Sequence, residues 1–367
     1  MSETNIASRP FMKGLDLCEL FYQEAVKPIL EEHFPDVDYS AALLFYGSEV
    51  LGFDTPQSMD HDWGPRLQLF LREEDHPVYS ERIDHVLRCE LPREIRGYPI
   101  DMAHADAEKG TSDSGTVTHD VRILTTRCFF QHILVWDPDE ELHASDWLAF
   151  SEQHLRSIAS GRVFHDGLAQ LEPIRARLRY YPHDVWLYML AAQWRRIGQE
   201  EAFMGRCGQV GDDLGSRLVA ARLVRDLMKL CFLMEQQYAP YIKWFGSAFA
   251  QLGCAGQLGP VLTNALRTET WQEREKHLST AYEFVTAMHN ELGITDPLPT
   301  QVSQFYDRPF VVIHADRFVD AIRERINSEE VKALPDHLGS VDQFTDSTEV
   351  LNLRQRFNRF KFIYRKE

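Results

Sequence analysis

The chain has 367 residues, 44% of them hydrophobic and 26% charged, which predicts a soluble globular protein of two or three domains. Its formal net charge of −17 argues against broad nucleic-acid binding, because nucleic-acid phosphates are held by many Lys and Arg side chains. No apolar run reaches the length of a membrane span, and the N-terminus lacks the basic start and apolar core of a signal peptide.

The first part of the chain, residues 1–140, alternates helical and strand-like patterns and predicts a mixed sheet with helices. Apolar residues three and four apart indicate helices, whereas short apolar or β-branched runs between turn residues indicate strands. In chain order we expect a helix at 14–33, a strand at 41–46, a short helix at 48–53, a strand at 60–71, a helix at 80–88, a strand at 95–103, a loop at 109–119 and a β-type run from 120.

From about Pro138 the pattern becomes helical, and an Asp-Pro turn followed by a capping residue predicts a domain boundary within 138–145. We expect a helical bundle domain at 141–300 and a C-terminal extension at 301–367 that packs on the other domains. The basic and aromatic tail from Arg354 is interpreted as an edge strand or helix that closes the fold, with a strand on RNA as the alternative. The predicted helices are 145–160, 163–178, 183–205, 212–236, 238–252, 259–267, 271–291 and 315–326, with a short strand at 310–313.

Two acidic residues, Asp60 and Asp62, follow the turn Gly47-Ser48 after a spacer of eleven residues. Carboxylates at i and i+2 of a strand share a face, and they repel each other unless a cation lies between them. Mg²⁺ prefers a few carboxylates together with substrate phosphates, and a Gly-Ser turn offers backbone N–H groups and a hydroxyl to a phosphate. The pattern predicts a magnesium site, with a solvated turn as the alternative.

This order of apolar strand, Gly-Ser, spacer and Asp-x-Asp resembles the signature of the polymerase-beta-like nucleotidyltransferase superfamily. Over most of its length the chain also resembles a bacterial nucleotidyltransferase-like family of unknown function. The resemblance implies an α+β fold with an N-terminal nucleotidyltransferase sheet, a C-terminal helical domain and a site in the cleft between them. The segments that carry it are 47–71, 94–99, 184–203, 215–244 and 305–310.

The resemblance implies Mg²⁺-dependent transfer of a nucleoside monophosphate from an NTP, with ATP as the expected donor, to a hydroxyl of an unidentified acceptor. Two metal ions would hold the attacking and leaving oxygens, bound by Asp60, Asp62 and a third carboxylate. We expect this third ligand to be Asp101, within Ile100-Asp101-Met102, with Asp120 as the alternative. Gly47 and Ser48 would bind the β- and γ-phosphates.

Basic residues supply a second group of candidates. Arg66 would either neutralise the triphosphate or merely pair with a surface acid. Arg222, Arg225 and Lys229 fall at i, i+3 and i+7 and therefore share a face of the predicted helix 212–236. By resemblance these three and Lys243 close over the triphosphate, and the alternative is a solvated basic stripe.

An acceptor base would come from Glu200 or Glu201, unless these residues form helix-surface pairs with Arg196. The negative charge favours a small-molecule acceptor, with a protein or tRNA as alternatives. Two other classes of function stay open: a nucleotide-binding regulatory or toxin–antitoxin-type module without turnover, and a nucleotide hydrolase or cyclase that uses the same metal site.

The six cysteines are scattered and show no CxxC spacing. This spacing argues against a disulfide framework and against structural zinc. We therefore expect reduced thiols in a cytoplasmic protein, without a membrane partner.

Overall fold

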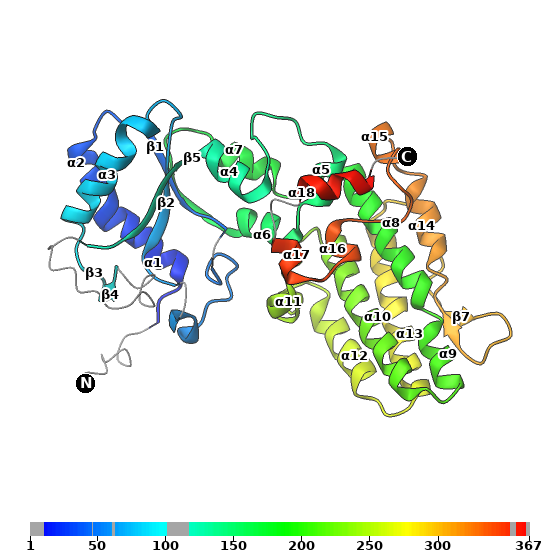
Figure 1. Cartoon of the computed structure of the whole chain (residues 1–367). Helices are drawn as coiled ribbons and strands as arrows, with labels where there is room; N and C mark the ends of the chain where they lie inside the picture. Colours follow the sequence, from blue (N-terminus) through cyan, green and yellow to red (C-terminus); the bar gives the residue numbers. More distant parts are fainter. Residues whose placement is uncertain (1–10, 46, 61–62, 101–116, 353–356, 365–367) are drawn as a thin grey trace. The chain divides into compact units, whose positions relative to one another are not determined.

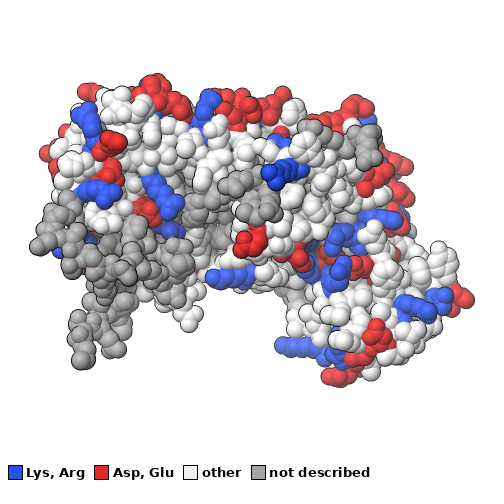
Figure 2. Space-filling view, in the orientation of Figure 1, with Lys and Arg blue, Asp and Glu red and all other residues white. Residues whose placement is uncertain are grey.

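A computed structural model describes residues 11–45, 47–60, 63–100, 117–352 and 357–364, with Asp60 described by its backbone alone. Contacts divide the chain into two units, which Figure 1 shows. Unit 1 comprises Met1–Glu141 with His154–Arg179, and unit 2 comprises Leu142–Gln153 with Tyr180–Glu367. Lys and Arg side chains are scattered among Asp and Glu on the face seen in Figure 2. This face is therefore not uniformly acidic, despite the net negative charge of the chain.

Unit 1 is built on a four-stranded mixed sheet with the strand order β5-β2-β1-β6. Strand β1 pairs antiparallel with β2 and with β6, whereas β2 pairs parallel with β5. All six residues of β2 are buried, as expected for a central strand that is covered on both faces. The strands are β1 Tyr39–Leu43, β2 Arg66–Leu71, β5 Asp120–Thr125 and β6 Arg162–Asp166.

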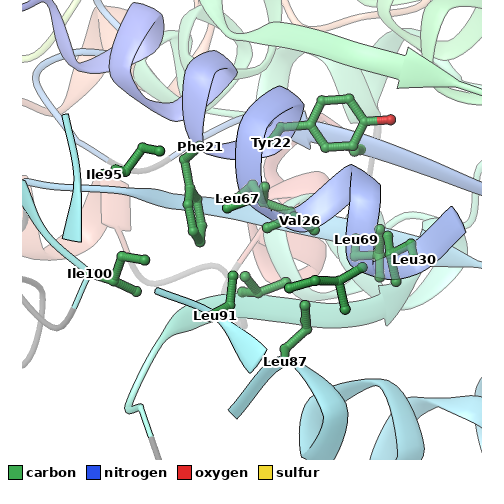
Figure 3. Packing of buried hydrophobic residues seen from close by; sticks show 14 of the residues in the cluster. Phe21, Tyr22, Val26, Leu30, Leu67, Leu69, Leu87, Leu91, Ile95 and Ile100 are labelled. Atoms are coloured by element: carbon green, nitrogen blue, oxygen red, sulfur yellow. The ribbon is translucent and has the colours of Figure 1, made fainter. Parts of the chain in front are cut away.

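Strand alternation assigns the side chains of β2 to two environments. Leu67, Leu69 and Leu71 lie in one apolar core with the N-terminal helices and α3, and Figure 3 shows Leu67 and Leu69 between residues of these helices. Phe70, on the other face, packs edge-on against Phe129 of α4, with ring centroids 5.4 Å apart. The other elements of this part of the chain are α1 Gly14–Phe21, a π-helical turn Tyr22–Val26, α2 Lys27–His33, a 3₁₀ turn Pro56–Asp60, α3 His76–Glu90, β3 Glu94–Ile95, β4 Tyr98–Pro99, α4 Thr126–Leu134, α6 Glu152–Ser160 and α7 Leu171–Arg177.

Five sequence predictions for unit 1 differ from the structure, the first being the β-type run from 120, which gives way to helix α4 at Thr126. The predicted helix at 48–53 is a turn, and the strand predicted from residue 60 begins only at Arg66. In place of a strand at 95–103, residues 94–99 form a hairpin that turns at Arg96 and Gly97, both with positive φ. The predicted helix 163–178 starts as strand β6, because its residues complete the edge of β1.

Unit 2 is helical, and its centre is a set of stacked aromatic and apolar side chains. Trp194 of α8 is fully buried and stacks on Phe318 of α14, with ring centroids 4.3 Å apart. Tyr364, at the end of the basic tail, is buried and donates to backbone carbonyls of Leu148 and Gly339, so the described part of the tail closes the fold as a helix. The elements are α5 Ala144–Ala149, α8 His183–Glu200, α9 Phe203–Gln209, α10 Asp213–Met234, α11 Ile242–Phe249, α12 Ala255–Arg267, α13 Trp271–Glu291, β7 Ser303–Gln304, β8 Val311–Val312, α14 Asp316–Arg323, α15 Glu329–Lys332, α16 Val341–Phe344, α17 Thr348–Asn352, α18 Phe357–Phe360 and a 3₁₀ turn Lys361–Tyr364.

The described helices are mostly amphipathic. None of them combines the length and the apolar character that crossing a bilayer requires.

Asp54 ties the loop between β1 and β2 to the start of α1. Its buried carboxylate accepts the Gly14 backbone N–H at 2.7 Å and the Trp63 indole N–H at 3.3 Å, and it bonds the Lys13 ammonium at 3.1 Å. Replacing it leaves buried donors without acceptors, which costs about 1–3 kcal/mol for each donor.

We expect Asp54→Ala to lower the free energy of unfolding in urea by at least about 2 kcal/mol. Asp38→Ala is the matched control, because the Asp38–Arg72 pair is exposed and its loss costs less than about 1 kcal/mol. Equal losses of unfolding free energy for the two substitutions would contradict the conclusion that Asp54 stabilises the loop against α1.

Candidate functional site

Gly47 lies four residues after Leu43, the last residue of β1. Its φ is +100°, a conformation that favours glycine. A Cβ atom at this position would also collide with the carboxylate of Glu49 and the guanidinium of Arg66. The turn therefore requires glycine for both backbone and packing reasons.

Ser48 begins a turn that is closed by backbone hydrogen bonds, from Phe53 N–H to Ser48 O at 2.9 Å and from Gly52 N–H to Glu49 O at 3.0 Å. Its side chain is half-buried, and its hydroxyl has no hydrogen-bond partner within the described residues. The turn thus presents a hydroxyl beside a glycine backbone, the two features that suit a phosphate oxygen.

Glu49 and Arg66 form a buried ion pair beneath this turn, with side-chain exposures of 1% and 6%. Burial raises the pKa of the Glu49 carboxyl, and the positive charge of Arg66 opposes that shift. Arg66 is thus paired with a buried acid and not with the surface acid that one of its two interpretations expected, and its role toward a triphosphate stays a prediction.

Asp120 is the acid that the sheet brings beside the start of β2. In the parallel pairing of β2 with β5, Arg66 is registered with Asp120, so both strands begin at the same edge. The Asp120 side chain is 11% exposed and bonds Arg122 Nε at 3.1 Å. A small hollow at this edge is lined by Leu43, Arg66, Leu67, Gln68, Asp120 and Arg122.

The predicted metal ligands lie largely outside the described residues. Asp60 is the last residue of the 3₁₀ turn. The Asp60 side chain and the whole of Asp62 and Asp101 lie outside the residues that the structure describes. Within the described ranges, no three His, Cys, Asp or Glu side chains gather as a metal site. The expected set of Asp60, Asp62 and Asp101 therefore stays a prediction.

The predicted basic stripe does gather in unit 2. Arg222, Arg225 and Lys229 of α10, together with Arg196 of α8, line a pocket of about 250 Å³, closed on one side by the segment 342–346. Lys243 is not in the lining: it is exposed and lies over the ring of Trp244, 5.1 Å from the centroid. The full lining is Arg196, Arg222, Arg225, Asp226, Lys229, Asp342, Gln343, Phe344, Thr345 and Asp346.

Each cation of this pocket, which we call the basic pocket, has a partner. Arg222 pairs with Glu200, and Arg225 pairs with Asp346 at 2.9 Å. Arg196 Nε lies 3.4 Å from the buried Asp226 carboxylate. The Lys229 ammonium donates to the backbone carbonyl of Asp342.

An amide network that sequence reasoning missed forms the floor of the basic pocket. Gln343 donates to Gln193 Oε1 and to Met189 O, each at 3.0 Å, and Gln193 donates to the Asp226 carbonyl at 3.0 Å. The sequence contained one signal: Ser340 and Gln343 have capping-box spacing, and the box is formed at the start of α16.

The candidate bases Glu200 and Glu201 have structural partners. Glu200 pairs with Arg222, whereas Glu201 accepts the backbone N–H groups of Ile313, His314 and Ala315 at 2.7, 3.0 and 3.2 Å. Burial raises the pKa of Glu201 to about 7. Within the described chain, Glu201 anchors the entry to α14.

Comparison with known proteins finds one relationship. A family model described as a domain of unknown function, DUF4037, matches residues 147–245. No curated protein and no solved structure matches the chain. The matched residues include all four cations of the basic pocket but not the Gly-Ser turn or the acidic pair. The match supports the presence of this domain of unknown function. Membership of the nucleotidyltransferase superfamily stays a prediction.

The two glycines of the turn offer a matched test of the crowding at Gly47. Gly52 also has positive φ, at +78°, but a Cβ there would meet nothing within 4 Å. We expect Gly52→Ala to cost about 1–3 kcal/mol of stability from backbone strain alone.

Gly47→Ala should cost several kcal/mol more, because the added methyl displaces a buried ion pair whose disruption costs about 3–5 kcal/mol. Thermal and urea unfolding of both variants provide the measurement. Equal losses of stability would mean that Glu49 and Arg66 do not constrain position 47.

Proposed function

We propose that the protein is a Mg²⁺-dependent nucleotidyltransferase that moves a nucleoside monophosphate, with AMP from ATP as the expected case, to a hydroxyl of a small acceptor. In this proposal Asp60, Asp62 and Asp120 bind the metal. Gly47 and Ser48 bind the outer phosphates. Arg66 positions the turn through Glu49 and does not contact the nucleotide.

The pairing of β2 with β5 is the observation that carries the proposal. The segment with Asp60 and Asp62 runs into the start of β2, and Asp120 opens the neighbouring parallel strand in register with Arg66. Because adjacent strands lie about 4.8 Å apart, Asp120 is held beside the point where the acidic segment enters the sheet.

The chemistry of these donors fits the proposed ion. All three are carboxylates, and Mg²⁺ takes oxygen ligands. The nearby cations described in unit 1 are already engaged, Arg66 by Glu49 and Arg122 by Asp120. When bound, Mg²⁺ would supply the positive charge that a triphosphate needs at this edge.

The chain's own groups then have separate tasks. The Gly47 backbone, without a side chain, allows a phosphate close approach, and the Ser48 hydroxyl can donate to a phosphate oxygen. The buried Glu49–Arg66 pair keeps this turn in one conformation, so the donors are oriented before the nucleotide binds.

The central test is incubation with each NTP, labelled at the α- or γ-phosphate, with Mg²⁺ and a mixture of candidate small-molecule acceptors. We expect pyrophosphate release and transfer of the α-label, both abolished in Asp60→Ala/Asp62→Ala and by EDTA. A double variant that keeps full activity would overturn the metal assignment.

Two further outcomes favour the other classes of function. Binding of NTP without any product indicates a regulatory module. Turnover that is independent of an acceptor indicates a hydrolase or cyclase.

A second prediction separates Asp120 from Asp101. Loss of a metal ligand lowers activity at least as much as loss of an outer-shell partner, which costs about 10–100-fold. We expect Asp120→Asn to lower kcat by about 100-fold or more and to raise the Mg²⁺ concentration needed for half-maximal rate.

Asp101→Asn should keep the wild-type rate and metal requirement. The reverse result, with Asp101→Asn impaired and Asp120→Asn unchanged, would return the third ligand to Asp101. Circular dichroism of each variant controls for folding.

A further inference from the structure

The basic pocket is complete within unit 2, since α8, α10 and the segment 342–346 supply its whole lining. Its polar floor is rigidly bonded, because Gln343, Gln193 and Asp226 form a chain of hydrogen bonds at about 3 Å. A cavity whose polar groups are fixed in advance loses little entropy on binding. The pocket is therefore built as a ligand site independently of unit 1.

The charge of the lining suits one anionic group. Arg196, Arg222, Arg225 and Lys229 are opposed by Asp226, Asp342 and Asp346 in the lining and by Glu200 beside Arg222. The set is therefore close to neutral and does not match the several negative charges of a triphosphate. A ligand with one phosphate or carboxylate can bind by taking the place of one acid.

Asp346 is the acid that can be replaced. Its side chain is 71% exposed and that of Arg225 is 35% exposed, and ion pairs of this exposure contribute at most about 1 kcal/mol. Rotation of Asp346 into solvent frees Arg225 for a bidentate contact with an incoming anion. The Asp346 carboxylate thus occupies the place of a ligand's anionic group.

Lys229 lies beside that place and forms no ion pair within 4.0 Å in the described chain, although the charges of Asp342, Glu152 and Asp226 act on it from farther away. Its ammonium donates to the Asp342 carbonyl. Burial, followed by the charge of Arg225, lowers the pKa of Lys229. An anion between Arg225 and Lys229 offsets their mutual repulsion and favours the charged form of Lys229.

An adjoining hollow extends the basic pocket and shares Arg225, Lys229, Asp342, Thr345 and Asp346 with it. Its other side is mostly apolar, with Glu152 and Thr348 as the polar exceptions, and Ile242 there is 66% exposed. The remaining apolar contributors are Ala239, Pro240, Tyr241, Phe245 and Leu351. A ligand that fills both hollows carries an anionic head and an apolar or aromatic body.

We propose that this basic pocket binds a small molecule that joins one phosphate or carboxylate group to an apolar or aromatic body. The site rests on its own lining in unit 2 and does not depend on the proposed nucleotidyl transfer. The donor nucleotide is left to the Gly-Ser turn and the acids of unit 1.

Isothermal titration of the full-length protein with phenyl phosphate, benzoate and inorganic phosphate tests the proposal. We expect phenyl phosphate or benzoate to bind more tightly than inorganic phosphate, with or without EDTA, and equally in Asp60→Ala/Asp62→Ala. The stronger of the two aromatic probes identifies the anionic group.

Variants of the basic pocket give opposite shifts. Lys229→Met and Arg225→Gln should each weaken the aromatic probe by about tenfold or more, because each removes a charge-assisted contact. Asp346→Asn should strengthen it several-fold, since it removes the competing carboxylate. Arg217→Gln, on the same helix but outside the pocket and paired with Asp213 and Glu269, is the control and should leave affinity unchanged.

Any of three results would contradict the proposed ligand site. These are no binding of any aromatic probe, binding that depends on Mg²⁺ or on Asp60 and Asp62, and an affinity that neither Lys229→Met nor Asp346→Asn changes.

Asp346→Asn is expected to increase affinity, and a misfolded variant would not show such an increase. Failure of the nucleotidyl transfer assay with binding intact rejects the proposed function alone. Transfer without probe binding rejects the pocket alone.

Discussion

Burying the charge of Arg66 determines the geometry around the Gly-Ser turn. Strand β2 places Leu67, Leu69 and Leu71 in the core, so alternation sends Arg66 to the other face, where neighbouring segments bury it. A buried guanidinium requires an acid, and Glu49 is the residue that supplies it. In this arrangement the ends of both side chains fill the space that a Cβ at position 47 would occupy. The location of Ser48 follows from this pairing.

The ion pairs of the two units differ in a way that matters for binding. Glu49 and Arg66 are almost fully buried, and such a pair is costly to break once formed. Arg225 and Asp346 are substantially exposed, and their separation costs little. The first kind of pair fixes a structure, whereas the second can exchange one anion for another. This difference makes charge pairing compatible both with the closed turn of unit 1 and with the ligand site proposed in unit 2.

Local sequence signals predicted the elements that local interactions determine. Helix α13 matches the prediction at 271–291, because its periodicity is reinforced by Thr270, whose side chain accepts the Glu273 N–H. Strand β6 was missed because pairing with β1, distant in sequence, overrides its helical pattern. The preference for Asp101 over Asp120 was made without register, which a single strand pattern does not reveal, and it stays a prediction because Asp101 lies outside the described residues. Gly47 and the stripe on α10 were found because turn geometry and helical spacing can be read locally.

The two candidate sites differ in how strongly their Lys and Arg side chains are already paired with acids. This difference determines what each site needs in order to bind an anion. In unit 1, Arg66 and Arg122 already bond acids beside the turn, so added phosphate charge there needs a divalent ion held by carboxylates. In unit 2, Lys229 has a carbonyl in place of an acid and Arg225 has an exposed partner, so an anion can bind without metal. Under the two proposals, a protein of net charge −17 binds two anionic molecules, one through Mg²⁺ and one through its own cations.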